Sequence, residues 1–254
     1  MNFYEKTVVI TGASRGIGAA TAEHFAAAGA HVVLAARRPR ETAQLAERIK
    51  DAGGVAEAVT CDVSRYDDVA ALARHAQSVN GRTDLWISNA GLIDPIARIA
   101  DSDPSAWSYV ADVNLKGVYF GLRAALPGMI NAGGGTFVHI SSGAATSALE
   151  GWSHYCATKA AVLSLTRVAD REYRDKGIRV IGLSPGTVAT AMQKTISASG
   201  INPVSKLDWS AHITPQDVAR AVAWAANPAA DAWLGQDFSL KSAEGRAIAG
   251  LPPL

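Results

Sequence analysis

The chain lacks an excess of positive charge. Its 24 lysines and arginines face 23 aspartates and glutamates, which leaves a formal net charge of +1 over 254 residues. A protein whose main partner is nucleic acid presents a basic field to the phosphates. We therefore expect no nucleic-acid partner.

Cysteine is equally scarce, with only Cys61 and Cys156. Their spacing fits no metal site, and two thiols in a chain of this length are no disulfide scaffold. We expect both to be small buried residues, and we predict no metal site.

Long apolar segments are also missing. The stretch 124–149 carries no Asp, Glu, Lys or Arg, but Pro127 and the glycines at 133–135 interrupt it, which is typical of a helix end, a turn and a buried strand. The first residues, MNFYEKTVVITG, lack the apolar core and the cleavage site of a signal peptide. We expect a cytoplasmic protein with no membrane partner.

The chain does contain an alternation of short β-branched runs with longer amphipathic stretches. Continuously apolar strands between helices predict an α/β fold, a doubly wound Rossmann-like parallel sheet of about seven strands flanked by helices, in a single domain over residues 1–254. The weaker periodicity of residues 187–213 indicates an insertion, which we expect to be a substrate lid. The expected strands are 7–12, 31–36, 55–61, 84–91, 136–141, 178–186 and 235–240, and the expected helices are 16–28, 40–51, 65–79, 104–130, 152–176 and 215–226.

A glycine-rich turn, TGASRGIG, joins the first expected strand to the first helix. A diphosphate needs free backbone N–H groups and the positive end of a helix dipole, and glycines let it approach the backbone. Three glycines alone are weak evidence, but those at 12, 16 and 18 lie between a buried strand and a helix. The turn therefore predicts a dinucleotide site.

Tyr155 and Lys159 are four positions apart, so they share one helix face. A nearby ammonium favours the phenolate and lowers the pKa of a tyrosine from its usual value of about 10. Ser142, just beyond the fifth expected strand, lies at the carboxyl edge of the sheet, where its hydroxyl would bond a substrate oxygen. This pattern predicts that Tyr155 transfers a proton.

Together these motifs resemble the short-chain dehydrogenase/reductase family, in its compact subgroup of about this length with TGxxxGxG and YxxxK motifs. The resemblance implies an oxidoreductase that transfers a hydride between a nicotinamide cofactor and a carbonyl or secondary alcohol substrate. It implies that Tyr155 is the general acid/base, that Lys159 lowers its pKa and binds the ribose, and that Ser142 orients the carbonyl. Asn114 falls where the family has an asparagine that holds a water-linked proton relay.

The resemblance also implies cofactor contacts in family order. The expected cofactor-binding residues are Gly12, Ser14, Arg15, Gly16, Ile17, Gly18, Arg37, Asp62, Val63, Asn89, Ala90, Gly91, Tyr155, Lys159, Pro185, Gly186, Val188 and Thr190.

The end of the second strand bears on which cofactor is used. An NAD-selective site places a carboxylate there, whereas this chain has Ala36 followed by Arg37, Arg38 and Arg40. We expect Arg15 and Arg37 to hold a phosphate and predict NADP(H) in preference to NAD(H), the alternative being that these arginines form a solvated loop.

The loop 143–152 and the insertion 187–213 would flank the nicotinamide pocket. The loop contains no Arg or Lys, so nothing in it demands an anionic substrate, and we expect a moderately apolar ketone, aldehyde or secondary alcohol. The expected substrate-binding residues are Ser142, Ala144, Leu149, Trp152, Met192 and Ile196.

Three other functions remain open, namely a cofactor-binding sensor without catalysis, an NAD-dependent dehydrogenase of the same fold, and an epimerase or dehydratase. We interpret His139 and His154 as structural. The family often ends near G-x-x-x-x-x-D-G-G, whereas this chain runs from GQDFSL into KSAEG without a glycine pair. In relatives the two long helices form interfaces, so we expect a homo-oligomer, a dimer or tetramer, with apolar stripes of Val110, Val113 and Val118 and of Val162, Leu165 and Val168.

Overall fold

The computed structural model describes residues 3–252. Its centre is one parallel sheet of seven strands in the order β3-β2-β1-β4-β5-β6-β7. This confirms the predicted single-domain Rossmann-like fold. The strands are β1 (Thr7–Thr11), β2 (His31–Ala36), β3 (Val55–Thr60), β4 (Leu85–Ser88), β5 (Gly135–Ile140), β6 (Ile178–Ser184) and β7 (Asp237–Ser239).

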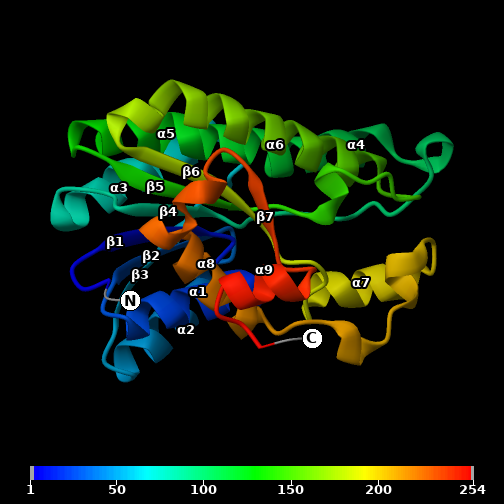
Figure 1. The fold of residues 1–254 in the computed structure, drawn as a ribbon, viewed down its shortest axis with the longest axis horizontal. Helices are drawn as coiled ribbons and strands as arrows, with labels where there is room; N and C mark the ends of the chain where they lie inside the picture. Colours follow the sequence, from blue (N-terminus) through cyan, green and yellow to red (C-terminus); the bar gives the residue numbers. More distant parts are fainter. Residues whose placement is uncertain (1–2, 253–254) are drawn as a thin grey trace.

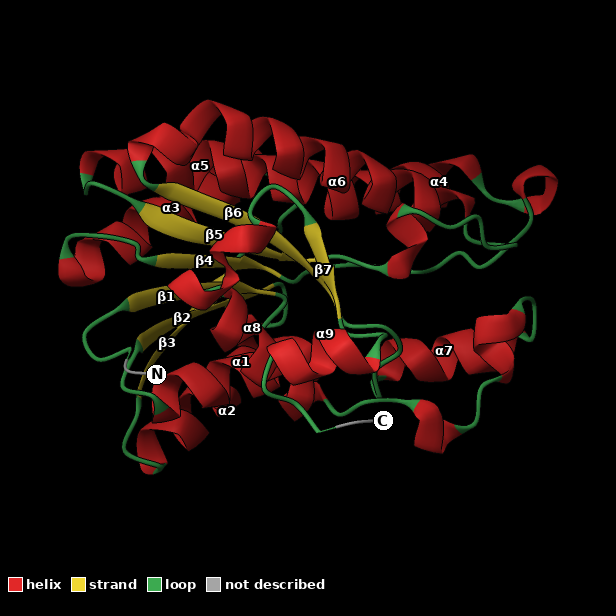
Figure 2. Cartoon of the chain, viewed as in Figure 1, coloured by secondary structure: helices red, strands yellow, loops and turns green. Residues whose placement is uncertain are grey.

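Helices cover both faces of the sheet (Figures 1 and 2). One face packs against α1 (Gly16–Ala27), α2 (Pro39–Asp51) and α8 (Pro215–Ala225), and the other against α3 (Tyr66–Asn80), α5 (Gly117–Asn131) and α6 (Ser153–Tyr173). Side chains alternate across a strand, so Val8 and Ile10 enter the first core while Val9 enters the second. Strands buried on both faces explain the continuous apolar runs of the sequence.

The helix expected over 104–130 is present, but a π-helical turn interrupts it. The chain forms α4 (Pro104–Ala111), a π-helical turn over Asp112–Lys116, and then α5. A π turn widens the helix and breaks the period of 3.6 residues on which the prediction rests. It carries Asn114, which is 1% exposed.

The insertion 187–213 is more regular than expected. It contains α7 (Ala191–Ser199) and short 3₁₀ turns, and a further helix, α9 (Ala243–Ile248), follows β7. In Figure 1, α4 and α7 extend past the same edge of the sheet on opposite sides. Of the two cysteines, Cys61 is buried as expected, but Cys156 is only half-buried.

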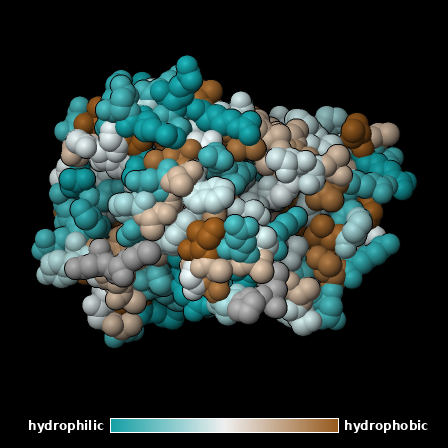
Figure 3. Space-filling model, in the orientation of Figure 1, coloured by the Kyte–Doolittle hydropathy of each residue, from teal (hydrophilic) through white to brown (hydrophobic). Residues whose placement is uncertain are grey.

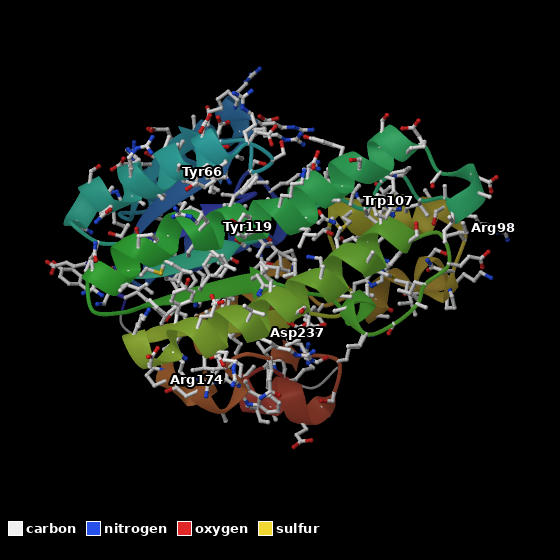
Figure 4. The ribbon with its side chains drawn as sticks, turned by 90° about the horizontal axis from the view of Figure 1, so that it is seen from above. Tyr66, Arg98, Trp107, Tyr119, Arg174 and Asp237 are labelled. Carbon is white, nitrogen blue, oxygen red and sulfur yellow. The ribbon has the colours of Figure 1, made fainter. Side chains whose placement is uncertain are left out.

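The apolar stripes expected to form interfaces lie mostly in the core. Val110, Val113, Val118 and Val162 are each at most 7% exposed. Val113, Val118 and Val162 belong to the core between this helical layer and the sheet, and α4, which carries Val110, packs against α6. Of the expected stripes, only Val168 of α6 is exposed. Tyr119 of α5, labelled in Figure 4, is a second outward-facing apolar side chain of this layer and was not expected.

The apolar side chains on the outer surface are scattered. In the view of Figure 3, apolar side chains form small patches separated by hydrophilic ones. Within residues 3–252, no helix has both the length and the apolar composition that crossing a membrane requires.

Two glycines of α5 differ in how closely their surroundings are packed. A Cβ added to Gly121 would lie 2.8 Å from Trp86 Nε1, whereas one added to Gly128 would lie 3.3 Å from the flexible end of Gln77. Alanine gains about 1 kcal/mol over glycine in a helix, but overpacking a core costs about 1–3 kcal/mol. We expect Gly121→Ala to lower the free energy of unfolding, measured in urea, and the control Gly128→Ala to leave it equal or higher. Equal stability of both variants would contradict the packing.

Candidate active site

A cavity of about 400 Å³ opens at the carboxyl edge of the sheet. Because all strand pairs are parallel, the ends of β1, β2, β4, β5 and β6 meet there. It collects segments that are distant in the sequence. Every predicted cofactor and substrate residue lines it except Gly18, and among the predicted catalytic residues Ser142, Tyr155 and Lys159 line it while Asn114 does not.

The turn after β1 forms the first part of the cavity wall. Gly12 and Gly16 adopt left-handed φ values of 64° and 57°. Asn89 Nδ2 donates to the carbonyls of Thr11 and Gly12, both at 3.0 Å, which fixes the turn against the end of β4. At the start of α1, Arg15 is the N-cap and makes no side-chain capping bond, so backbone N–H groups stay available. This cradle fits the diphosphate of a dinucleotide.

Gly18 is buried behind the turn and does not line the cavity, contrary to its prediction as a cofactor contact. A Cβ there would lie 2.6 Å from Asn89 Nδ2. The bare Cα of Gly18 is needed for this close approach. Its part is therefore to position the turn.

The end of the cavity beside β2 is cationic. Ala36 ends β2, and Arg15, Arg37 and Arg38 line the wall. Arg37 Nη1 donates to Tyr109 Oη, and its Cζ lies 5.8 Å from the centre of the Tyr109 ring. Arg38 was not among the expected cofactor contacts but lines the wall. Tyr109 was not singled out either, because α4 approaches the end of β2 only in the folded chain.

Tyr155, Lys159 and Ser142 come together at the opposite end. Lys159 Nζ donates to the carbonyl of Ile140, the last residue of β5, at 2.7 Å and lies 5.5 Å from the centre of the Tyr155 ring. Ser142, two residues beyond Ile140, hydrogen-bonds Tyr155 and accepts from the Ala144 N–H at 3.2 Å. One lysine thus ties the strand end that carries Ser142 to the helix that carries Tyr155.

Burial dominates the protonation of this pair. It raises the pKa of Tyr155 to about 12, although the hydrogen bond with Ser142 acts in the opposite direction. Burial also lowers the pKa of Lys159 to about 8, and the charge of Asp237 opposes that shift. The net shift of the Tyr155 pKa is therefore upward, opposite in direction to the expected lowering, because burial of the phenol is its largest cause. Near neutral pH Tyr155 is a protonated phenol.

A polar cluster behind the site was not predicted. Ser141 Oγ donates to the Asp237 carboxylate, and His139 Nε2 lies 3.4 Å from Asp237 Oδ1. Burial acts to raise the pKa of Asp237, but His139, Ser141 and Lys159 together lower it below its usual value. Figure 4 shows Asp237 beside α6, on the side away from α5. His139 does not line the cavity, in keeping with a structural role.

The predicted substrate residues other than Ser142 form one apolar cluster with Tyr155. The rings of Trp152 and Tyr155 meet edge to face, with centres 5.6 Å apart. Among the described residues, no group hydrogen-bonds the buried Trp152 Nε1. The cluster includes Ile93, Ala144, Leu149, Trp152, Tyr155, Met192 and Ile196.

Asn114 lies behind the cavity wall. Its Oδ1 accepts from the Leu92 N–H at 2.8 Å, and its Nδ2 donates to the Leu92 carbonyl at 2.9 Å. Both side-chain polar atoms thus hold the loop after β4. His154, also buried, approaches the Ile93 carbonyl in the same loop, with its Nε2 2.8 Å away. Burial lowers the pKa of His154.

Thr190 and Lys241 also line the cavity wall. Thr190 caps α7, where its Oγ1 accepts from the Gln193 N–H at 3.4 Å. Lys241 follows β7 and was not predicted, because no spacing links it to the catalytic motifs. Only the pairing of β7 with β6 brings it to this edge.

Known proteins are similar to this chain in sequence and in fold. The model of the family described as short chain dehydrogenase matches residues 6–200. The 3beta-hydroxysteroid dehydrogenase 1 of Eggerthella lenta is 37% identical over 231 residues, which cover 87% of each chain. The cis-4-hydroxycyclohexanecarboxylate dehydrogenase of Sinomonas cyclohexanicum is 36% identical, covering 92% of this chain and 94% of its own. A solved structure, a 7 alpha-hydroxysteroid dehydrogenase complexed with NADH and 7-oxo glycochenodeoxycholic acid, has a TM-score of 0.84 at 29% identity and covers 95% of each chain.

Proposed function

Because the chain belongs to the short-chain dehydrogenase family, we propose that it transfers a hydride between NADP(H) and a carbonyl compound or the matching secondary alcohol. The family binds a nicotinamide cofactor. The observation that carries the proposal is the convergence of Ser142, Tyr155 and Lys159 on one buried phenol in the cavity. A protonated phenol in a dry pocket is a proton donor for a developing alkoxide.

In carbonyl reduction the bound cofactor supplies the hydride that reaches the carbonyl carbon. Ser142 then donates to the carbonyl oxygen and orients it toward Tyr155. Tyr155 Oη gives its proton to this oxygen, which becomes the alcohol hydroxyl. The Lys159 ammonium stabilises the phenolate that remains. Oxidation of an alcohol uses the same groups in reverse.

The arginines at the cationic end of the cavity support the choice of NADP(H). Arg15, Arg37 and Arg38 line the end of the cavity beside Ala36, where a carboxylate would repel a 2′-phosphate. An NAD-dependent enzyme is the alternative, and the related 7 alpha-hydroxysteroid dehydrogenase was solved with NADH. The three guanidinium groups favour NADP(H). The remaining predicted contacts, from Asp62 to Thr190, would hold the rest of the cofactor.

A ring ketone is the proposed substrate class. Two relatives act, by name, on hydroxylated ring compounds. The apolar cluster around Trp152 and Tyr155 offers flat and aliphatic surfaces for such a ring. Met192 and Ile196 reach it from α7, which supports the insertion 187–213 as a lid over the substrate.

Assembly is a separate proposal. Exposed Tyr119 and Val168, on neighbouring helices of one layer, support a homo-oligomer.

A first test removes the phenolic proton. We expect Tyr155→Phe to lower kcat by about 10²–10⁴-fold, because general acid catalysis contributes about that much. The Kd for NADPH should change little. Tyr173→Phe, at the far end of the same helix, is the control and should keep full activity. Turnover like that of the native chain in Tyr155→Phe would rule out the proposed role.

A second test concerns the cofactor. We expect kcat/KM to favour NADPH over NADH in the native chain. Replacing Arg37 by glutamate should lower the NADPH/NADH ratio at least about tenfold, because it places a carboxylate near the 2′-phosphate. Arg40→Glu makes the same charge change outside the cavity wall and should leave the ratio unchanged. A preference of the native chain for NADH would contradict the proposed use of NADP(H).

A third test follows the pKa of Lys159, which burial lowers to about 8. The ammonium is charged below that pH and loses its charge above it, while Tyr155 stays protonated to about 12. Carbonyl reduction should therefore decline above about pH 8 in a profile of kcat/KM from pH 6 to 10. Residual activity of Lys159→Arg should show no such decline, since a guanidinium stays charged. A flat native profile would contradict the assignment.

A further inference from the structure

Lys241 reaches the substrate end of the cavity from the segment after β7. A Cβ added to Gly186 would lie 3.4 Å from Lys241 Cγ, and one added to Gly143 would lie 2.8 Å from Lys241 Nζ. The aliphatic stem thus passes the Pro185–Gly186 turn. The ammonium ends against Gly143, the residue next to Ser142.

No acidic group accounts for this placement. Among residues 3–252, no carboxylate forms an ion pair with Lys241, and no side chain or carbonyl accepts from its Nζ. The cavity wall contains one carboxylate, Asp62, which follows β3 at the cationic end. The other cation of the substrate end, Lys159, already donates to the Ile140 carbonyl.

The sequence around Lys241 departs from the family pattern. Counting from Gly235 in G-x-x-x-x-x-D-G-G, Lys241 occupies the position of the aspartate. The charge at the rim of the cavity is therefore inverted relative to that pattern. A charge inverted at a cavity wall changes which ligands the wall favours.

We propose that the substrate carries a carboxylate or a similar anionic group, which the Lys241 ammonium binds beside Ser142. This inference rests on the proposed function, because the carbonyl of the same molecule would lie at Ser142 and Tyr155. The sequence-based expectation about substrate charge considered only the loop 143–152, which contains no cation. The cation comes from a different part of the chain.

The cofactor phosphates do not need Lys241. The phosphate turn and the three arginines lie after β1 and β2, whereas Lys241 lies over the loop after β5. β1 is separated from β6 and β7 by β4 and β5 in the sheet. Lys241 is thus a specificity residue on the substrate side of the nicotinamide.

The test compares two ketones that differ in charge. 4-Oxocyclohexanecarboxylate and its methyl ester are reduced with NADPH by the native chain, Lys241→Met and Lys241→Arg, with Lys50→Met as an exposed control of equal charge change. We expect the acid/ester ratio of kcat/KM to fall about tenfold in Lys241→Met, to persist in Lys241→Arg and to be unchanged in Lys50→Met. The native ratio should also fall as salt is added, since Lys241 is exposed at the rim.

A binding measurement separates this inference from the proposed reaction. Cyclohexanecarboxylate and cyclohexanecarboxamide have no ketone, and their binding in the presence of NADP⁺ is followed by intrinsic fluorescence, to which Trp152 in the wall contributes. If the Kd for cyclohexanecarboxylate rises about tenfold in Lys241→Met, the inference is supported even when no ketone is reduced. A lack of turnover would then count against the proposed function alone. If the acid/ester ratio of kcat/KM and the acid/amide ratio of affinity are the same in the native chain and in Lys241→Met, the inference is overturned. A loss of NADPH affinity in Lys241→Met that is the same with both ketones also overturns it, since it would place Lys241 at the cofactor.

Discussion

The hydrogen bond from Lys159 Nζ to the Ile140 carbonyl is the constraint on which the site depends. Burying an ammonium costs free energy unless its protons are bonded, and the last carbonyl of β5 accepts one of them. The bond fixes α6 against the end of β5. Ser142 lies two residues past that carbonyl, and Tyr155 lies one helical turn before the lysine, so one contact sets the distance between them.

The same burial sets the protonation states. It raises the pKa of Tyr155 to about 12 and lowers that of Lys159 to about 8. Below about pH 8 the pair is therefore a neutral phenol beside an ammonium, and the ammonium loses its proton first as the pH rises. Asp237, held by Ser141 and close to His139, keeps a negative charge behind Lys159 and limits how far the lysine pKa falls. The polar cluster behind the cavity therefore acts on the reacting groups through Lys159.

The sequence predicts the parts of this protein that follow from local rules. Buried parallel strands must be apolar throughout, the turn at residues 12–18 needs glycine, and a Tyr–Lys spacing of four needs a helix, so the sheet and most of the cavity wall are predictable. The π turn at Asn114 is not, because a helix that widens by one residue leaves no compositional mark. Val113 and Val118 were expected at an interface but are buried, since a helix period alone does not show which apolar face meets the sheet. Lys241, Tyr109 and Asp237 were missed because their contacts exist only in the folded chain.

The balance of the whole chain conceals the polarity of its cavity. A net charge of +1 argues only against an overall basic field. The described cavity wall nevertheless carries Arg15, Arg37 and Arg38 at one end, Lys159 and Lys241 at the other, and one carboxylate, Asp62. Between the two cationic ends lies the apolar cluster of Trp152 and Tyr155. Phosphates that bind at the first end neutralise only that end, because β4 and β5 separate it from β7. Asp237 already lies behind Lys159 at the second end, so Lys241 is the cation there that no described carboxylate pairs. An anionic group on the substrate is the partner that we infer for it.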